Sequence, residues 1–137
     1  MTTSFLPVDQ WTLPMCGIFA IFASSKSETD LRKKLIECSS RLRHRGPDWS
    51  GYHCHIQKTD QHTHGIGHER LAIIDPESGS QPLLSPDGNL VLAAKGEIYN
   101  YKELYENLKE DYTPLTGSDC EVVIPLYQQV SDYVMFK

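Results

Sequence analysis

A cysteine stands directly before the first apolar segment of this chain. Cys16 follows Met15 and precedes residues 17–23, which are apolar or small. A short run of this kind predicts a buried strand. Ser27 and Asp30 then supply side chains that favour the start of a helix. The chain is therefore expected to open with a buried strand that has a thiol at its first end and a helix after its second.

The predicted helix runs from residue 28 to about residue 42. Leu31, Leu35, Cys38 and Leu42 recur on one face of it. The helix is expected to end before Pro47, because the residue that precedes a proline is disfavoured in the helical region.

Strand and helix signals alternate along the rest of the chain. Residues 52–64 predict a strand pair with an exposed loop, residues 65–75 a strand, and residues 83–94 a hairpin with its turn at 86–89. Two helices are expected after capping boxes, which pair Asn100 with Glu103 and Ser118 with Glu121. This mixture with hairpins favours an α+β fold over a parallel α/β sheet.

The last helix is predicted to bury one apolar face. Its members would be Val122, Val123, Leu126, Tyr127 and Val130. Pro125 lies inside the pattern, and we expect a kink there because a proline removes one backbone hydrogen bond.

Composition excludes several classes of function. The 137 residues suffice for one domain, and the net charge of −5 argues against a nucleic-acid partner. No apolar run approaches the ~20 residues needed to span a bilayer, and residues 1–14 lack the basic and apolar regions of a signal peptide. The four cysteines are irregularly spaced without a C-x-x-C pair, which favours neither a disulfide framework nor a zinc ribbon. We therefore expect a cytoplasmic protein with no membrane partner.

Cys16 would gain special chemistry as the first residue of a chain. Its thiol would then share one residue with an α-amino group whose pKa lies near ~8, close enough to neutrality to accept the thiol proton. In this sequence fifteen residues precede Cys16, so that nitrogen is part of an amide. We interpret residues 1–15 as a flexible N-terminal extension, whose removal, or initiation at Met15, would expose the amine.

Five segments carry a resemblance to a known family. They are Met15-Cys16-Gly17-Ile18-Phe19, Arg43-His44-Arg45-Gly46-Pro47-Asp48, His68-Glu69-Arg70-Leu71-Ala72-Ile73-Ile74-Asp75, Gly96-Glu97-Ile98-Tyr99-Asn100 and Thr116-Gly117-Ser118-Asp119-Cys120-Glu121. In this order and spacing the sequence resembles the class II glutamine amidotransferase (glutaminase) domain of glutamine-hydrolysing asparagine synthetases.

The resemblance implies a fold and a set of partners. The fold would be the N-terminal-nucleophile sandwich of antiparallel sheets flanked by helices, with residues 16–137 a partial type-2 glutamine amidotransferase domain that is incomplete at its C-terminus. L-Glutamine would be the substrate, hydrolysed to glutamate and ammonia for ATP-dependent asparagine synthesis from aspartate. This segment would need no cofactor or metal, whereas ATP and magnesium would belong to a synthetase domain absent from these residues. The resemblance leaves a homodimer open for the full-length protein.

The resemblance also implies a role for each matched residue. Cys16 would attack the side-chain amide of glutamine, and the Gly96 N–H would bind the oxyanion. Arg70 would hold the substrate carboxylate and Asp119 its ammonium group, a pairing that suits an amino-acid zwitterion. The glutamine site would be completed by Leu71, Ala72, Ile73, Ile74, Lys95 and Glu97.

One position departs from the family. An asparagine, whose side-chain amide is the second oxyanion donor, is expected where this chain has Lys95. Loss of one such donor typically costs ~3 kcal/mol of transition-state stabilisation. The sequence therefore predicts weakened glutaminase activity.

Simpler interpretations remain open for individual residues. Cys16 could be a core cysteine, Arg70 a surface ion-pair partner of Glu69 or Asp75, and Asp119 a first-turn helix acid. The shared order of the five segments favours the site over these alternatives.

Two other functions are compatible with the sequence of the whole chain. It could be a catalytically silent glutamine-binding or interaction fragment, as Lys95 and the N-terminal extension suggest. Alternatively, the pairs His53/His55 and His62/His64 could bind a metal across a hairpin. A solvated polar hairpin is the simpler interpretation of those histidines.

Overall fold

The fold was obtained as a computed structural model, which describes residues 15–56, 61–71 and 79–135. Residues 1–14 of the predicted N-terminal extension (1–15) and the segment 72–78 lie outside this description. Within the described ranges, no helix has both the length and the apolar character required to cross a membrane.

The strands form two antiparallel sheets. The larger sheet has the order β1-β3-β2, and the smaller is the hairpin β4-β5. Their bounds are β1 (Gly17–Ser24), β2 (Trp49–Ile56), β3 (Thr63–Arg70), β4 (Leu83–Leu84) and β5 (Val91–Leu92). The predicted strand at 17–23 and the hairpin at 83–94 are confirmed. The strand pair predicted within 52–64 was wrong in its bounds, because β2 ends at Ile56 and residues 63–64 already belong to β3. β3 continues into the strand predicted for 65–75 and ends at Arg70.

The helical elements follow the expected order. They are α1 (Glu28–Ser39), η1 (Ser40–Leu42), α2 (Tyr101–Glu106), η2 (Asp119–Val122) and α3 (Val123–Met135). Helices and antiparallel sheets are thus mixed along the chain, which confirms the α+β class.

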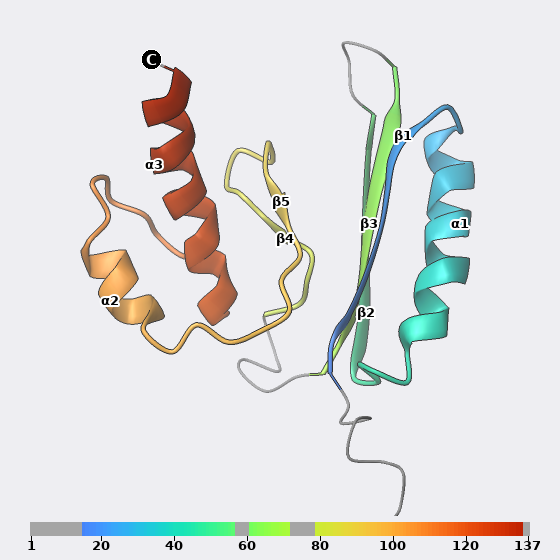
Figure 1. Ribbon diagram of the computed structural model, residues 1–137, viewed down its shortest axis with the longest axis horizontal. Coiled ribbons are helices and arrows are strands. Elements are labelled where there is room, and N and C mark those ends of the chain that lie inside the picture. The colour runs from blue at the N-terminus through green and yellow to red at the C-terminus, as the bar shows by residue number, and fades with distance from the viewer. Residues whose placement is uncertain (1–14, 57–60, 72–78, 136–137) are drawn as a thin grey trace, which may run out of the picture.

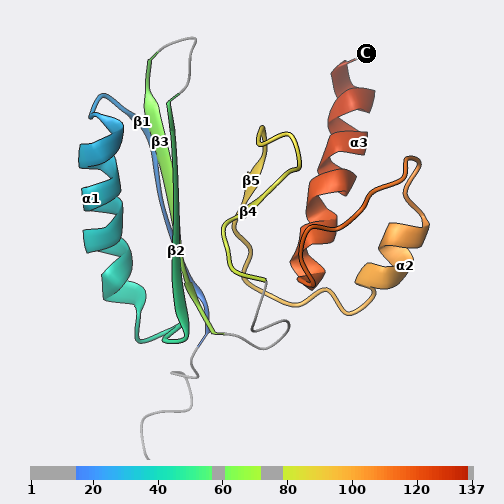
Figure 2. The same ribbon diagram turned by 180° about the vertical axis from the view of Figure 1, so that it is seen from behind.

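The elements are arranged in layers. Figure 1 shows α1 covering one face of the β1-β3-β2 sheet, while β4-β5, α3 and α2 follow one another on the other side. The view from behind in Figure 2 gives the same sequence of layers. A small core lies on each side of the larger sheet. Leu31 and Leu35 of α1 are fully buried, and Leu83, Cys120 and Ile124 form a second buried cluster.

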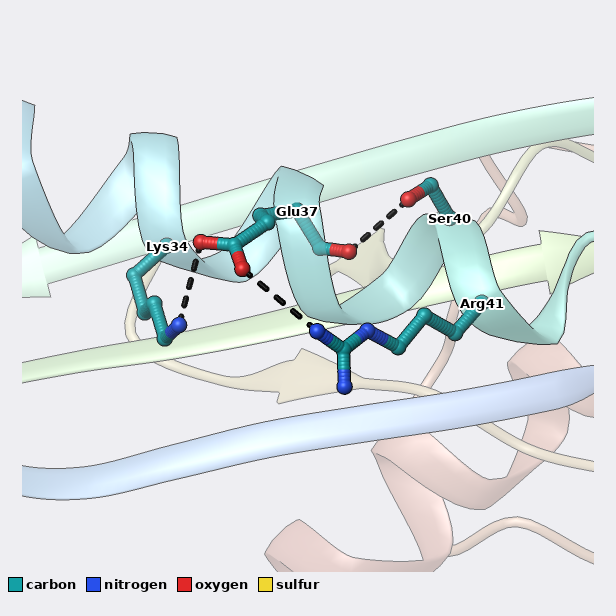
Figure 3. Close-up of polar contacts among 4 residues, drawn as sticks. All are labelled: Lys34, Glu37, Ser40 and Arg41. Carbon is teal, nitrogen blue, oxygen red and sulfur yellow. Dashed lines mark hydrogen bonds and ion pairs between the residues drawn. The ribbon is translucent and has the colours of Figure 1, made fainter.

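Helix α1 begins as its sequence predicts. Ser27 Oγ accepts a hydrogen bond from the Asp30 N–H at 3.2 Å, which is a side-chain N-cap. On the outer face, Glu37 bridges Lys34 at 3.0 Å and Arg41 at 3.6 Å (Figure 3). All three side chains are largely exposed, so solvent screens these ion pairs and they contribute little to stability.

The expectation that Pro125 lies in the interior of the last helix was wrong. Helix α3 begins at Val123, so Pro125 lies in its first turn. Amide groups in the first turn have no acceptor within the helix, and a proline there removes no helical hydrogen bond.

The predicted buried face of α3 was also partly wrong. Val122 is buried, but Tyr127 is 57% exposed and Val130 is 62% exposed. The helix instead turns Ile124 inward, because Ile124 packs against Leu83 and Cys120 in the second core. The face was therefore set by tertiary packing.

Neither predicted capping box forms. Asn100 and Ser118 make no side-chain cap hydrogen bond. Glu121 is 1% exposed and turns toward the preceding loop, where it accepts hydrogen bonds from Tyr112 Oη, Leu115 N, Thr116 N and Thr116 Oγ1. One buried carboxylate thus fixes the loop that leads into η2.

We predict that Glu121→Gln lowers the free energy of unfolding by about 2–3 kcal/mol, because the amide NH₂ cannot accept the bonds that one carboxylate oxygen now accepts. Urea denaturation measures this change. Glu110→Gln, at an exposed position of the same charge, is the matched control and should change stability little. Equal effects of the two substitutions would contradict the assignment.

Candidate functional site

The described residues enclose a pocket of about 370 Å³ at one end of the larger sheet. It lies where the start of β1 and the end of β3 meet two loops, one that follows β5 and one that precedes η2. All seven predicted site residues within the described ranges line it: Cys16, Arg70, Leu71, Lys95, Gly96, Glu97 and Asp119. Ala72, Ile73 and Ile74 lie outside the described residues.

Strand pairing places the Cys16 thiol. In the β1/β3 register Gly17 is opposite Glu69, so the residue before β1 lies beside the residues that end β3. Cys16 Sγ accepts a hydrogen bond from the Leu71 N–H at 3.3 Å and lies 3.6 Å from the Leu71 carbonyl oxygen. The thiol is therefore held at the pocket wall next to Arg70.

Two opposite charges face the same pocket. Arg70 is 5% exposed and Asp119 is 4% exposed. This burial rules out the interpretation of Arg70 as a surface ion-pair partner. Asp119 Oδ2 accepts a hydrogen bond from the Ile98 N–H, which ties η2 to the loop that contains Gly96.

The loop from 95 to 99 contributes four residues to the pocket lining: Lys95, Gly96, Glu97 and Tyr99. Gly96 has a φ of 151°, a conformation that favours glycine, and nothing lies within 4 Å of where a Cβ would be. Lys95 is exposed, and Glu97 is half-buried. Tyr99 is 86% exposed, and its hydrogen bond with Glu97 raises the pKa of the tyrosine.

Cys120 is a second thiol in the pocket, which sequence reasoning did not assign to the site. It is 3% exposed, and its Sγ lies 3.5 Å from the Gly96 carbonyl oxygen, to which it donates. Burial, together with the negative charge of Asp119, raises the pKa of Cys120 to about 11. It is therefore protonated at neutral pH and is a poor nucleophile. Its position next to Asp119 in the sequence was the available signal.

The Arg43–Asp48 segment supports the backbone of Arg70. The Asp48 N–H donates to the Arg70 carbonyl oxygen at 3.0 Å. A Cβ on Gly46 would lie 2.2 Å from the Glu69 carbonyl oxygen, so only glycine fits there. Glu69 is itself fully buried and accepts hydrogen bonds from the hydroxyls of Ser50 and Tyr52.

Gln81 also lines the pocket, and the sequence analysis did not predict it. It is 7% exposed and comes from the segment that leads into β4. No local pattern marked this glutamine, because its position depends on packing between the two sheets.

The histidine-rich hairpin lies at a separate pocket of about 270 Å³. His55 and His64 are opposite each other in the β2/β3 register, and the Ala23 N–H donates to His64 Nδ1 at 3.4 Å. Across the described ranges, no three His, Cys, Asp or Glu side chains are grouped so that they could hold a metal ion.

Comparison with known proteins gives consistent results. Residues 15–136 match the family model described as a glutamine amidotransferase domain. The chain is 50% identical over 115 residues to asparagine synthetase [glutamine-hydrolyzing] 3 of Arabidopsis thaliana, a match that covers 84% of this chain and 19% of that protein. It is 48% identical over 118 residues to asparagine synthetase [glutamine-hydrolyzing] of Zea mays, with 86% and 19% covered.

A fungal relative has a similar sequence identity to this chain. The probable asparagine synthetase [glutamine-hydrolyzing] of Schizosaccharomyces pombe is 48% identical over 115 residues, covering 84% of this chain and 20% of its own length. The chain thus spans about a fifth of the length of these curated relatives. Because the family match covers nearly the whole chain and the described site residues share one pocket, this chain belongs to the glutamine amidotransferase domain family.

Proposed function

We propose that this chain hydrolyses the side-chain amide of glutamine, with Cys16 as the N-terminal nucleophile. The observation that carries the proposal is one pocket that holds a thiol, a buried cation and a buried anion: Cys16, Arg70 and Asp119. The names of the relatives, which are glutamine-hydrolysing enzymes, support the same reaction. In a longer protein the ammonia would serve asparagine synthesis from aspartate.

The pocket suits a free amino acid. A guanidinium binds a carboxylate through two parallel hydrogen bonds, and an aspartate carboxylate pairs with an ammonium group. A substrate that lacks one of the two groups cannot make one of these charge-assisted contacts, so it binds less tightly and is discriminated against. The volume of about 370 Å³ also lies at the small end of the range for ligand pockets.

The reaction would proceed in two steps. The Cys16 sulfur bonds to the amide carbon of glutamine while the α-amino group of Cys16 takes the thiol proton. The Gly96 N–H donates to the oxyanion, and the amine returns its proton to the leaving nitrogen as the C–N bond breaks. Departure of ammonia from this tetrahedral intermediate leaves a thioester, which water then hydrolyses to glutamate and the free thiol.

The order of layers supports the proposal that the fold is an N-terminal-nucleophile sandwich. A helix, a three-stranded sheet, a hairpin and further helices follow one another in Figure 1. This order fits part of an N-terminal-nucleophile sandwich over residues 16–137. In the longer protein, ATP and magnesium would be bound by the synthetase domain, and the enzyme would act in the cytoplasm.

A silent glutamine-binding fragment is the second candidate. Met15 lines the pocket and is 41% exposed, so the residue that blocks the Cys16 amine lies at the site itself. Lys95 also stands where the family has its second oxyanion donor. This candidate predicts glutamine binding without release of ammonia.

Intact-mass analysis combined with an ammonia-release assay distinguishes glutamine hydrolysis from silent glutamine binding. We expect ammonia release from glutamine only in preparations whose intact mass shows Cys16 as the first residue, and Cys16→Ser should lower kcat at least ~10³-fold because a hydroxyl is a far weaker nucleophile. Cys38→Ser, a half-buried cysteine of α1, is the matched control and should remain active. Equal ammonia release by chains with and without residues 1–15 would refute the proposed nucleophile.

We predict that Lys95→Asn raises kcat for glutamine hydrolysis by about 10²–10³-fold, because it restores a neutral amide donor beside Gly96. Lys102→Asn, at an exposed lysine outside the pocket, should leave kcat unchanged. A Lys95→Asn rate equal to that of the parent chain would show that Lys95 itself stabilises the oxyanion.

We predict that Gly46→Ala raises KM for glutamine about tenfold or more, because the new methyl group would displace the backbone of Glu69 and Arg70. Steady-state kinetics measures the change. Gly88→Ala, in the β4-β5 turn at a φ of 71°, is the matched control: it strains the backbone away from Arg70 and should leave KM unaltered. A folded Gly46→Ala protein with the parent KM would contradict the supporting role of this segment.

A further inference from the structure

Ala94 is held on both sides by side chains from distant parts of the chain. Its N–H donates to Gln81 Oε1 at 2.6 Å, and its carbonyl oxygen lies 3.1 Å from His68 Nε2. Ala94 comes two residues before Gly96. Both backbone polar groups of Ala94, a residue close to the proposed oxyanion donor Gly96, are thus bound by side chains.

A glycine brings the three segments together. Gly51 of β2 is opposite His68 of β3, so both residues face the same side of the sheet. A Cβ on Gly51 would lie 1.8 Å from the Gln81 carbonyl oxygen. The absence of that atom lets the backbone at Gln81 rest directly on the sheet, next to the His68 side chain. From these positions the Gln81 side chain reaches the Ala94 N–H and the His68 side chain reaches the Ala94 carbonyl oxygen.

The histidine is suited to donate this hydrogen bond. His68 is fully buried, and burial lowers its pKa, so the imidazole is neutral and carries one N–H. Nδ1 is buried and has no hydrogen-bond partner among the described residues. A proton on Nδ1 would leave a buried donor unsatisfied, which is costly, so the proton belongs on Nε2, facing the Ala94 carbonyl.

Gly96 has no side chain that could fix the position of its own N–H. It is exposed, lacks a side chain, and has a φ of 151° with open space around its Cβ position. On its C-terminal side, Asp119 holds the Ile98 N–H and Cys120 contacts the Gly96 carbonyl. On its N-terminal side, the bonds to Ala94 provide the corresponding restraint.

We propose that His68 and Gln81 are positioning residues, which hold the Ala94 peptide and thereby aim the Gly96 N–H at the oxyanion formed beside Cys16. The inference rests on the proposed glutamine hydrolysis. An oxyanion donor must be placed within about 0.5 Å of its productive position to lower the barrier, and a loop glycine cannot achieve this alone.

The first test separates kcat from KM in the full chain, in the form that releases ammonia. His68→Leu and Gln81→Met each remove one bond to Ala94, and we expect kcat to fall about 10–100-fold with KM changed less than about threefold, because the donor is misplaced rather than lost. His68→Gln retains an N–H at the reach of Nε2 and should keep kcat within about threefold of the parent. His53→Leu, on the neighbouring strand and outside the glutamine pocket, is the matched control.

The second test is independent of catalysis. Amide hydrogen exchange at Lys95 and Gly96 should be faster in His68→Leu and Gln81→Met than in the parent chain or in His68→Gln. An active parent whose variants keep kcat, raise KM alone, or lose kcat without faster exchange at Gly96 would overturn the positioning role and leave glutamine hydrolysis standing. A parent that begins at Cys16 and releases no ammonia would refute the hydrolysis itself.

Discussion

The antiparallel pairing of β1 with β3 is the interaction on which the site depends. With Gly17 opposite Glu69, the residue that precedes β1 must lie beside the residues that end β3. Cys16 consequently shares two backbone contacts with Leu71 and lies next to Arg70. A shift of one residue in this register would turn the side chains of β1 to the opposite face and remove the thiol from the pocket.

Buried polar groups complete the site around that pairing. Glu69, His68, Asp119 and Glu121 are each at most 4% exposed, and each side chain makes a hydrogen bond to another segment. The partner of Glu69 lies on the paired strand β2, and the partners of the other three lie in loops. Burying such groups is costly unless they are bonded, so each one restricts the arrangement of its partners. The loop that carries Gly96 is held to β3 by the His68 bond and to η2 by the Asp119 bond.

Sequence reasoning succeeded where a short local pattern has a single structural consequence. The apolar run after Cys16, the serine at the start of α1 and the turn at residues 86–89 predicted their elements correctly, because local propensity and periodicity act over a few residues. It failed for Glu121 and for the inner face of α3. A buried carboxylate can cap its own helix or bind a neighbouring loop, and an apolar helix can turn either of two faces inward. Packing of Ile124 against Leu83 decided the second case.

The sequence alone determined the chemical groups and their order along the chain. A thiol before a strand, an arginine at the end of another, a glycine in a loop and an aspartate at a helix start were all visible there. The tertiary structure decided that these groups share one pocket, that Cys120 joins them as a protonated thiol, and that His68 and Gln81 meet at Ala94. The hydrogen bonds of the site join residues separated by 13 to 55 positions. Such residues come within hydrogen-bond distance only through strand pairing in the larger sheet and through the packing of the hairpin and loops against it.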